Sequence, residues 1–117
     1  MWTYQARIPF DFIVGAKTYD AGQFVIEVER PNYLADILAI KNAEGKRLAR
    51  TALTRNGHRS LNDKTKLIFS VFEDAYVLKE IVAPNFGFTA PKPDTATWVL
   101  ITGNEQRPKK TVTIVLD

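Results

Sequence analysis

Apolar and polar residues alternate along most of this chain, and a period of two predicts strands. The clearest case is Ile8–Gly15, where four apolar side chains fall on one face of an expected strand. Pro9 marks an edge or the entry of that strand, because proline has no N–H for a ladder. A polar turn then closes at Gly22, and Phe24–Glu29 alternates apolar with acidic residues as a second, half-buried strand.

Six further stretches have strand-like patterns and are separated by turn signals. Asn42–Gly45 predicts a tight turn in which Gly45 takes the positive φ that closes a hairpin. Thr54–Thr65 is expected to be an exposed loop that crosses between sheets, and the prolines of 84–94 predict a loop or an extended crossover. Gly103–Pro108 is expected to join the last two strands. The six expected strands are Leu34–Lys41, Lys46–Leu53, Leu67–Val71, Tyr76–Val82, Thr97–Thr102 and Thr111–Leu116.

The number and spacing of these strands predict an all-β fold. About eight strands with turns at short intervals indicate an antiparallel β-sandwich or a flattened small barrel. The chain has 117 residues, of which 45% are hydrophobic and 25% charged. We therefore predict one β domain over residues 1–117. The chain has no cysteine, which excludes disulfide and thiolate chemistry.

Several of these strand and turn motifs together resemble a known group of proteins. They are Ile8–Phe12, Val14–Gly15, Lys17–Thr18, Ala21–Gly22, Asn42–Lys46, Lys66–Phe69 and Tyr76–Leu78. With them the chain resembles small exported all-β bacterial proteins that are abundant in acidobacterial genomes and usually follow a signal peptide. The resemblance covers the chain from Ala6 to Ile81 and implies fold and export, but it brings no functional residues. Phe86–Asp117 departs from the pattern, and its role stays open.

Charge and hydropathy restrict the expected partners and location. The formal net charge of +3 is far weaker than the concentrated basic stripe of a nucleic-acid binder, so nucleic acid is not an expected partner. No apolar run reaches the roughly 18–20 residues that span a bilayer, and no basic and then apolar leader opens the chain. The strand-like start at Met1–Tyr4 suits a mature form whose leader was replaced by a start methionine, although a cytoplasmic start would look the same. The resemblance favours a periplasmic or extracellular location.

Reactive groups are few, and they predict a protein without enzymatic activity. His58 is the only histidine, so a site with several histidines cannot form, and we predict neither a metal site nor a cofactor. Asp11 and Asp20 are the local pair of carboxylates on which a hydrolase mechanism could be built. Asp11 is also placed to accept backbone N–H groups of the following turn or to pair with Lys17. A carboxylate hydrolase therefore stays an alternative.

The basic segment of residues 50–66 is a candidate ligand site. Guanidinium forks match phosphate, sulfate and acidic sugar groups, and an exposed indole offers a stacking surface. The candidate ligand-binding residues are Arg55, His58, Arg59, Lys64 and Trp98. The alternatives are a solvated loop whose charges aid solubility, and a Trp98 side chain that belongs to the core. This segment supports the hypothesis of a small-ligand or glycan-binding domain, with an acidic glycan or another anion as its partner.

The two ends of the chain support a different hypothesis. Trp2–Arg7 and Thr111–Asp117 are strand-like, so we expect them at sheet edges, where an unprotected edge can pair with another chain. The candidate assembly residues are Trp2, Tyr4, Val112 and Ile114. Our first hypothesis is a non-enzymatic structural or protein-interaction module that associates with itself or with another protein through its edge strands. For Trp2 the alternative is that its side chain caps an open barrel end.

Overall fold

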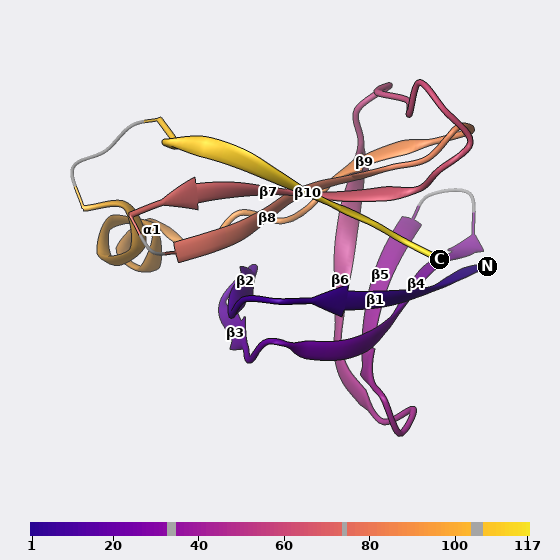
Figure 1. The fold of residues 1–117 in the computed structure, drawn as a ribbon, viewed down its shortest axis with the longest axis horizontal. Coiled ribbons are helices and arrows are strands. Elements are labelled where there is room, and N and C mark those ends of the chain that lie inside the picture. The colour runs from indigo at the N-terminus through magenta and orange to yellow at the C-terminus, as the bar shows by residue number, and fades with distance from the viewer. Residues whose placement is uncertain (33–34, 74, 104–106) are drawn as a thin grey trace.

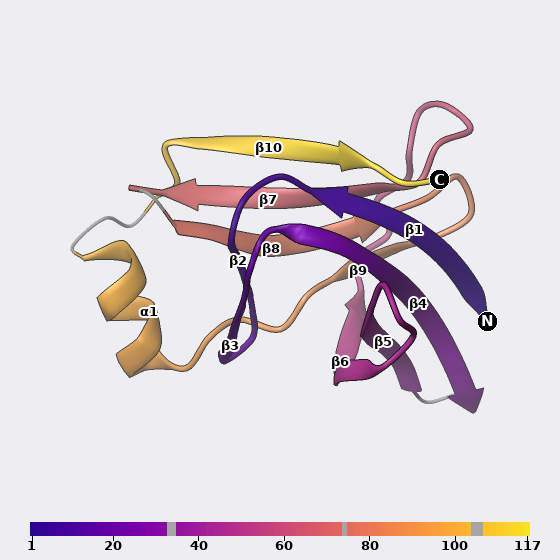
Figure 2. The same cartoon turned by 60° about the horizontal axis from the view of Figure 1, so that its bottom comes forward.

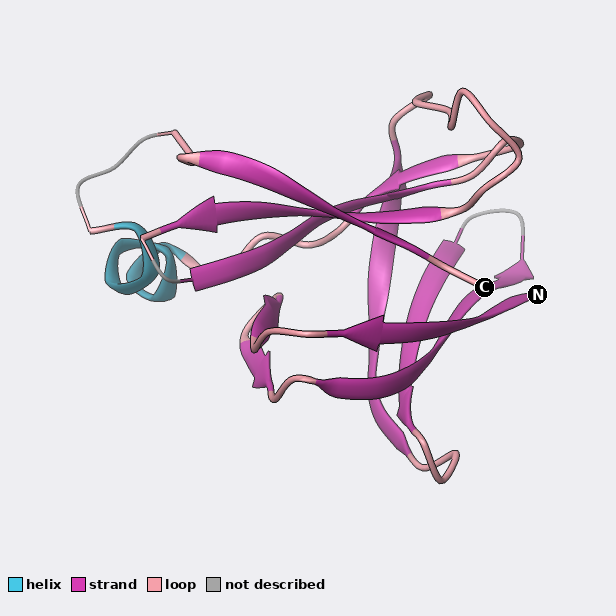
Figure 3. Ribbon diagram, viewed as in Figure 1, coloured by secondary structure: helices cyan, strands magenta, loops and turns pink. Residues whose placement is uncertain are grey.

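The computed structural model describes residues 1–32, 35–73, 75–103 and 107–117, and these residues form ten strands and one short helix (Figures 1 and 3). This confirms the predicted all-β fold, with more strands than expected. The elements are β1 Trp2–Ile8, β2 Phe12–Val14, β3 Lys17–Tyr19, β4 Gly22–Asn32, β5 Ala35–Asn42, β6 Arg47–Arg55, β7 Lys66–Phe72, β8 Ala75–Val82, β9 Gly87–Thr89, α1 Thr95–Thr102 and β10 Lys110–Val115.

The strands lie in two layers that share β6 (Figures 1 and 2). In the first layer the order is β1-β4-β5-β6, and all pairings are antiparallel. Thr54 and Arg55 at the end of β6 pair with β9, which carries the sheet into the second layer, formed by β9, β8, β7 and β10. Gln5 of β1 and Asp117 also exchange two backbone hydrogen bonds of 3.0 and 3.2 Å. The two layers are therefore joined at a second place as well.

The core lies between the two layers and is built around aromatic rings. Phe12, on the short strand β2, packs edge to face on Phe24 of β4 at 5.3 Å and on Phe69 of β7 at 5.7 Å between ring centroids. All three side chains are buried. Burial of one such side chain contributes about 1.5–3 kcal/mol, and edge-to-face pairing adds to it. Phe12 thus ties the first layer to the second.

The stretch Ile8–Gly15 forms two strands, not the predicted single strand. β1 ends at Ile8 and β2 begins at Phe12, because Pro9 cannot donate to the ladder and the chain bends there. The Asp11 carboxylate accepts the N–H of Ala21 at 2.8 Å, which confirms that Asp11 holds the following turn. That turn was predicted to be a loop, but it contains β3, which pairs back on β2.

Two other boundaries differ from the prediction. The basic segment 50–66 is not one loop, because Arg55 still pairs with β9 and Lys66 already pairs with β8, so the loop proper is 56–65. The crossover predicted at 84–94 contains the short strand β9. Two predicted features lie partly outside the described residues. They are the start of the strand Leu34–Lys41 and the loop Gly103–Pro108.

The strand predicted at Thr97–Thr102 is wrong, because this stretch belongs to helix α1 at one end of the molecule (Figure 3). Asp94 caps the helix by accepting the N–H of Thr97 at 2.8 Å, and Gly103, with φ 61°, ends it. This capping outweighs the strand preference of the β-branched and aromatic residues between the two ends. The predicted last hairpin is wrong as well, since β10 pairs with β7.

We expect α1 to depend on the ionised carboxylate of Asp94. Hydrogen bonds from Thr97 lower the pKa of this carboxyl below its ordinary value. A lowered pKa in the folded state gives stabilisation that is present at neutral pH and is lost as the pH falls through that pKa. Helical NMR shifts of residues 95–102 should therefore weaken at low pH in the parent chain, and at all pH values in Asp94→Ala.

The Asp94→Asn variant is the matched control. Asparagine caps helices about as well as aspartate but does not titrate. The helical shifts of Asp94→Asn should stay constant across the acid range in which the parent loses them. Equal shifts in the parent and in Asp94→Ala at neutral pH would contradict the capping role.

Candidate functional site

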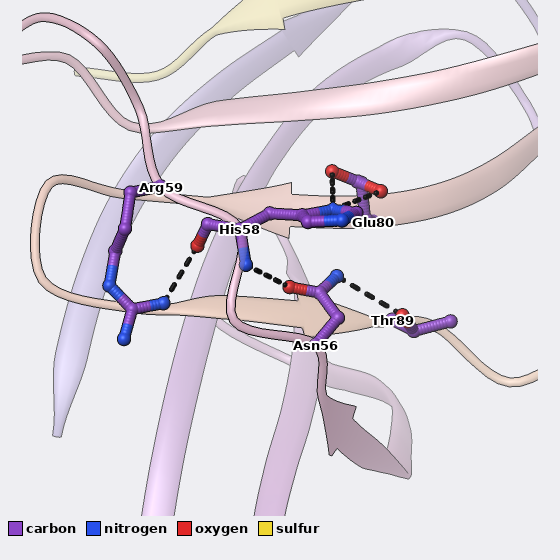
Figure 4. A network of polar contacts seen from close by, with 5 residues as sticks. All are labelled: Asn56, His58, Arg59, Glu80 and Thr89. Carbon is purple, nitrogen blue, oxygen red and sulfur yellow. Dashed lines mark hydrogen bonds and ion pairs between the residues drawn. The ribbon is translucent and has the colours of Figure 1, made fainter.

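The loop of residues 56–65 is held against the second layer by hydrogen bonds (Figure 4). The backbone N–H of Asn56 donates to the carbonyl of Gly87 at 3.1 Å. The side-chain amide of Asn56 donates to the Thr89 hydroxyl at 3.1 Å, and its oxygen accepts the N–H of His58 at 2.9 Å. Further along, the N–H of Ser60 donates to the carbonyl of Ala83 at 3.0 Å. The loop therefore presents its side chains from a backbone that is already ordered, which reduces the entropy lost on binding.

Glycine at position 87 makes this close approach possible. A Cβ atom on Gly87 would lie 2.1 Å from the carbonyl oxygen of His58 and 2.6 Å from the side-chain oxygen of Asn56. Atoms in proteins do not approach so closely, so any larger residue would push the loop away from β9. Gly87 thus sets where the loop lies.

Three arginines gather in a cleft of about 370 Å³ that we call the arginine cleft. Arg30 comes from the end of β4, Arg55 from the end of β6, and Arg59 from the loop. Trp2 and Asn85 complete much of the lining, together with the backbone around Gly87. Two strands of the first layer and a loop of the second therefore supply the positive charge of one cleft.

One carboxylate organises two of these arginines. Asp36 on β5 receives the Nε of Arg30 at 3.0 Å on one oxygen and the Nε of Arg55 at 3.1 Å on the other. Both pairings use Nε. The terminal Nη groups of the two guanidiniums make no hydrogen bond to another described residue. Arg59 forms no ion pair with any described residue and donates one N–H to the carbonyl of His58 at 2.8 Å. Three positive charges thus face one negative charge.

Aromatic rings form the floor of the arginine cleft. Trp2 packs on Phe86 at 4.8 Å and Phe86 on Phe88 at 5.1 Å, while the Arg55 guanidinium lies 5.9 Å from the centroid of Phe88. Phe86 and Phe88 are buried, whereas Trp2 is half-buried. Trp2 is therefore the ring that can meet a ligand, and the cation–π contact helps to orient Arg55.

The His58 ring and the Arg59 side chain point in opposite directions, and the ring lies against Glu80 (Figure 4). Its Nδ1 lies 3.2 and 3.3 Å from the two oxygens of Glu80, a β8 residue that is only 7% exposed. His58 and Glu80 line a second cleft of about 330 Å³ together with Trp98 of α1. We call it the Trp98 cleft. A local turn accompanies this division, because Gly57 has a positive φ of 78° and the Asn56 side chain accepts the N–H of His58 at 2.9 Å.

The structure therefore separates the predicted ligand-binding residues. Arg55 and Arg59 line the arginine cleft, His58 and Trp98 line the Trp98 cleft, and Lys64 lines neither. Trp98 is half-buried and packs edge to face on Phe72 at 5.1 Å, outside the main core cluster.

Three of the predicted assembly residues, Trp2, Tyr4 and Ile114, pack against the core with part of their surface, and Val112 is half-buried. The partial packing of Trp2 matches the alternative in which its ring covers an end of the core. Tyr19 of β3 is buried, and this burial raises the pKa of its hydroxyl.

Sequence patterns missed Arg30, Asp36 and Glu80. Arg30 and Asp36 lie at strand ends, two residues from the buried Val28 and Leu38, so alternation places them on the core face. Alternation does not show that charged side chains meet there. Asp36 pairs in register with Leu53, which places it diagonally from Arg55 on the same face. Register of this kind would have revealed the Asp36–Arg55 pair, but the alternation alone does not supply it.

Comparison of the chain with protein-family models, with curated proteins and with solved structures finds no match. Among the described residues, no three histidine, aspartate or glutamate side chains come together as ligands for a metal ion. No helix in the described part of the chain has the length and apolar character needed to cross a membrane.

We expect Gly87→Ala to destabilise the protein by about 1–3 kcal/mol, because the new methyl group overlaps the loop backbone. Urea unfolding measures this change. The matched control is Gly22→Ala, where a Cβ meets nothing closer than the Phe24 ring at 3.8 Å and stability should stay nearly constant. Equal stability of Gly87→Ala and the parent chain would show that the loop does not depend on this contact.

Proposed function

We propose that the protein is a non-enzymatic binding domain whose arginine cleft takes an anionic ligand. The convergence of Arg30, Arg55 and Arg59 on one cleft supports this proposal most directly. Asp36 offsets one of their three positive charges, which leaves a net charge of +2 at the cleft. Like charges in a cleft raise the local concentration of counter-ions and favour a ligand of opposite sign.

The chemistry of the donors favours a carboxylate, sulfate or phosphate group. The guanidinium fork matches two oxygens of such groups and makes short, charge-assisted hydrogen bonds with them. Asp36 holds Arg30 and Arg55 by Nε and so leaves their outer N–H groups for a ligand. The half-exposed ring of Trp2 beside the arginines suits a sugar ring. An acidic sugar combines both features and is the ligand class we propose.

Calorimetric titration tests this proposal, with a glucuronate-containing disaccharide, the matching neutral glucose disaccharide and inorganic sulfate as probes. We expect the acidic disaccharide to bind, sulfate to bind more weakly, and the neutral sugar not to bind. Arg59→Ala should weaken the acidic disaccharide by about 10–100-fold, since a hydrogen bond to a charged group contributes about 1.5–3 kcal/mol. Arg59 is the preferred site because its removal breaks no ion pair among the described residues.

Lys64→Ala is the matched control for charge. It removes one positive charge from the same loop but from outside the cleft, so it should leave the affinity almost unchanged. Equal losses in Arg59→Ala and Lys64→Ala would indicate a diffuse charge effect and contradict a site in the arginine cleft. Failure of both anions to bind would contradict the proposal itself.

Self-association through a strand edge is a second candidate, favoured by the hydrogen bonding of β10. Among the described residues β10 pairs on one side only, with β7, and beyond it Asp117 bonds Gln5 of β1. The N–H of Leu116 points to the β7 side, where it donates to Thr65. By alternation, the N–H groups of Thr111, Thr113 and Val115 point away from β7 and could receive another strand.

A single substitution can close this edge without changing the β7 ladder. Thr113→Pro removes an outward N–H and should shift a dimer to monomer in light scattering at high micromolar concentration. Thr113→Val keeps the N–H and should leave the mass unchanged. A parent chain that is already monomeric at this concentration would exclude the β10 edge as an assembly site.

A further inference from the structure

The Trp98 cleft lies between helix α1 and the outer side of the second layer, and the anion site does not use it. Its apolar walls include Phe72 and Val77 of the sheet, Ala90 after β9, Trp98 of α1 and Pro108 before β10. Its volume of about 330 Å³ is at the small end of the range for ligand pockets, roughly 300–1,000 Å³. The size and the walls fit one small ring with a short substituent.

The polar side of this cleft is rich in hydrogen-bond acceptors. Glu80, which is 7% exposed, has His58 Nδ1 as its hydrogen-bond partner among the described residues. A carboxylate has about four lone-pair sites, so a single N–H shared between its two oxygens leaves most of them unused. A buried carboxylate in this state gains strongly from one more donor.

His58 adds a second polar group, because its Nδ1 lies against Glu80 and its Nε2 makes no hydrogen bond to another described residue. In the neutral tautomer that carries its proton on Nδ1, Nε2 accepts a hydrogen bond. The hydroxyl groups of Ser70 and Thr89 also line the cleft and can accept. A ligand that matches this side of the cleft must therefore bring a hydrogen-bond donor.

The geometry points to a binding site for a small hydroxylated aromatic compound in the Trp98 cleft. The ring would pack against Trp98 and Phe72, which already meet edge to face at 5.1 Å, and the hydroxyl would donate to Glu80 or to His58 Nε2. A phenol hydroxyl is a strong donor and carries no net charge. It can therefore sit beside Glu80 without being repelled by Lys79 and Lys92, the two exposed cations at the same cleft.

A titration followed by ¹H–¹⁵N NMR tests this inference, with phenol as the probe and toluene as its match without the donor. The chain has two tryptophans, so the Trp2→Phe variant assigns the remaining indole signal to Trp98. We expect phenol to shift the Trp98 indole and the Glu80 amide, and to bind at least several-fold more tightly than toluene. Arg59→Ala should change neither result, which separates this site from the arginine cleft.

Two variants locate the determinants. Glu80→Gln keeps the shape of the side chain but removes its charge, so the preference for phenol over toluene should fall several-fold. Ala90→Leu fills the apolar wall and should abolish binding of both probes, which keeps the inference testable if Glu80→Gln does not fold. The Trp98 signal reports the integrity of α1 in each variant.

Two charged probes complete the test. Benzoate and benzylamine have nearly the same ring as phenol but bring an anion or a cation. Tighter binding of benzoate than of phenol would show that the lysines determine the ligand. Tighter binding of benzylamine than of phenol would show that the charge of Glu80 determines it. Either result would overturn the inference. It would also be overturned by equal binding of phenol and toluene, or by phenol that leaves the Trp98 signal unmoved.

Discussion

The contact between the loop 56–58 and Gly87 is the constraint on which both clefts depend. The loop can lie against β9 because position 87 has no side chain, and a Cβ there would come within 2.1 Å of the His58 carbonyl oxygen. The same place is the corner where β6 passes from the first layer to the second. The contact that joins the two layers thus also sets the positions of the side chains of residues 55–59. Stability and site geometry share one set of contacts here.

One short segment, residues 55–59, contributes side chains to two clefts, and it turns at Gly57, which has a φ of 78°. Arg55 and Arg59 bring donors and positive charge to one side, while His58 joins the buried carboxylate of Glu80 on the other side. Glycine adopts this positive φ without strain, and the Asn56 side chain holds the turn by accepting the N–H of His58. The arginine cleft receives its remaining charge from the first layer and the Trp98 cleft its remaining apolar surface from α1. Each cleft therefore combines groups that are far apart in the chain.

The parts that the sequence predicts well are those decided by local pattern. Period-two alternation identifies most strands, and the turn at Gly45 has the expected positive φ of 85°. Helix α1 was missed because its two caps, Asp94 and Gly103, outweigh the strand preference of the residues between them. The basic segment predicted Arg55 and Arg59 as ligand-binding residues, but it did not predict Asp36, which meets Arg55 through strand register that alternation alone does not determine. His58 was grouped with the arginines because it is close to them in sequence, whereas the turn at Gly57 and the contact with Glu80 place its ring in the other cleft.

The energetics of the Asp36 cluster argue for a role beyond stability. Exposed ion pairs contribute about 0–1 kcal/mol, and the Arg55 side chain is 57% exposed, so a second arginine on Asp36 adds little to folding. Excess positive charge costs stability through mutual repulsion among Arg30, Arg55 and Arg59. A single arginine would already have neutralised Asp36. The arrangement is favourable once an anion enters the cleft, because the ligand then removes the repulsion and uses guanidinium N–H groups that Asp36 has already oriented.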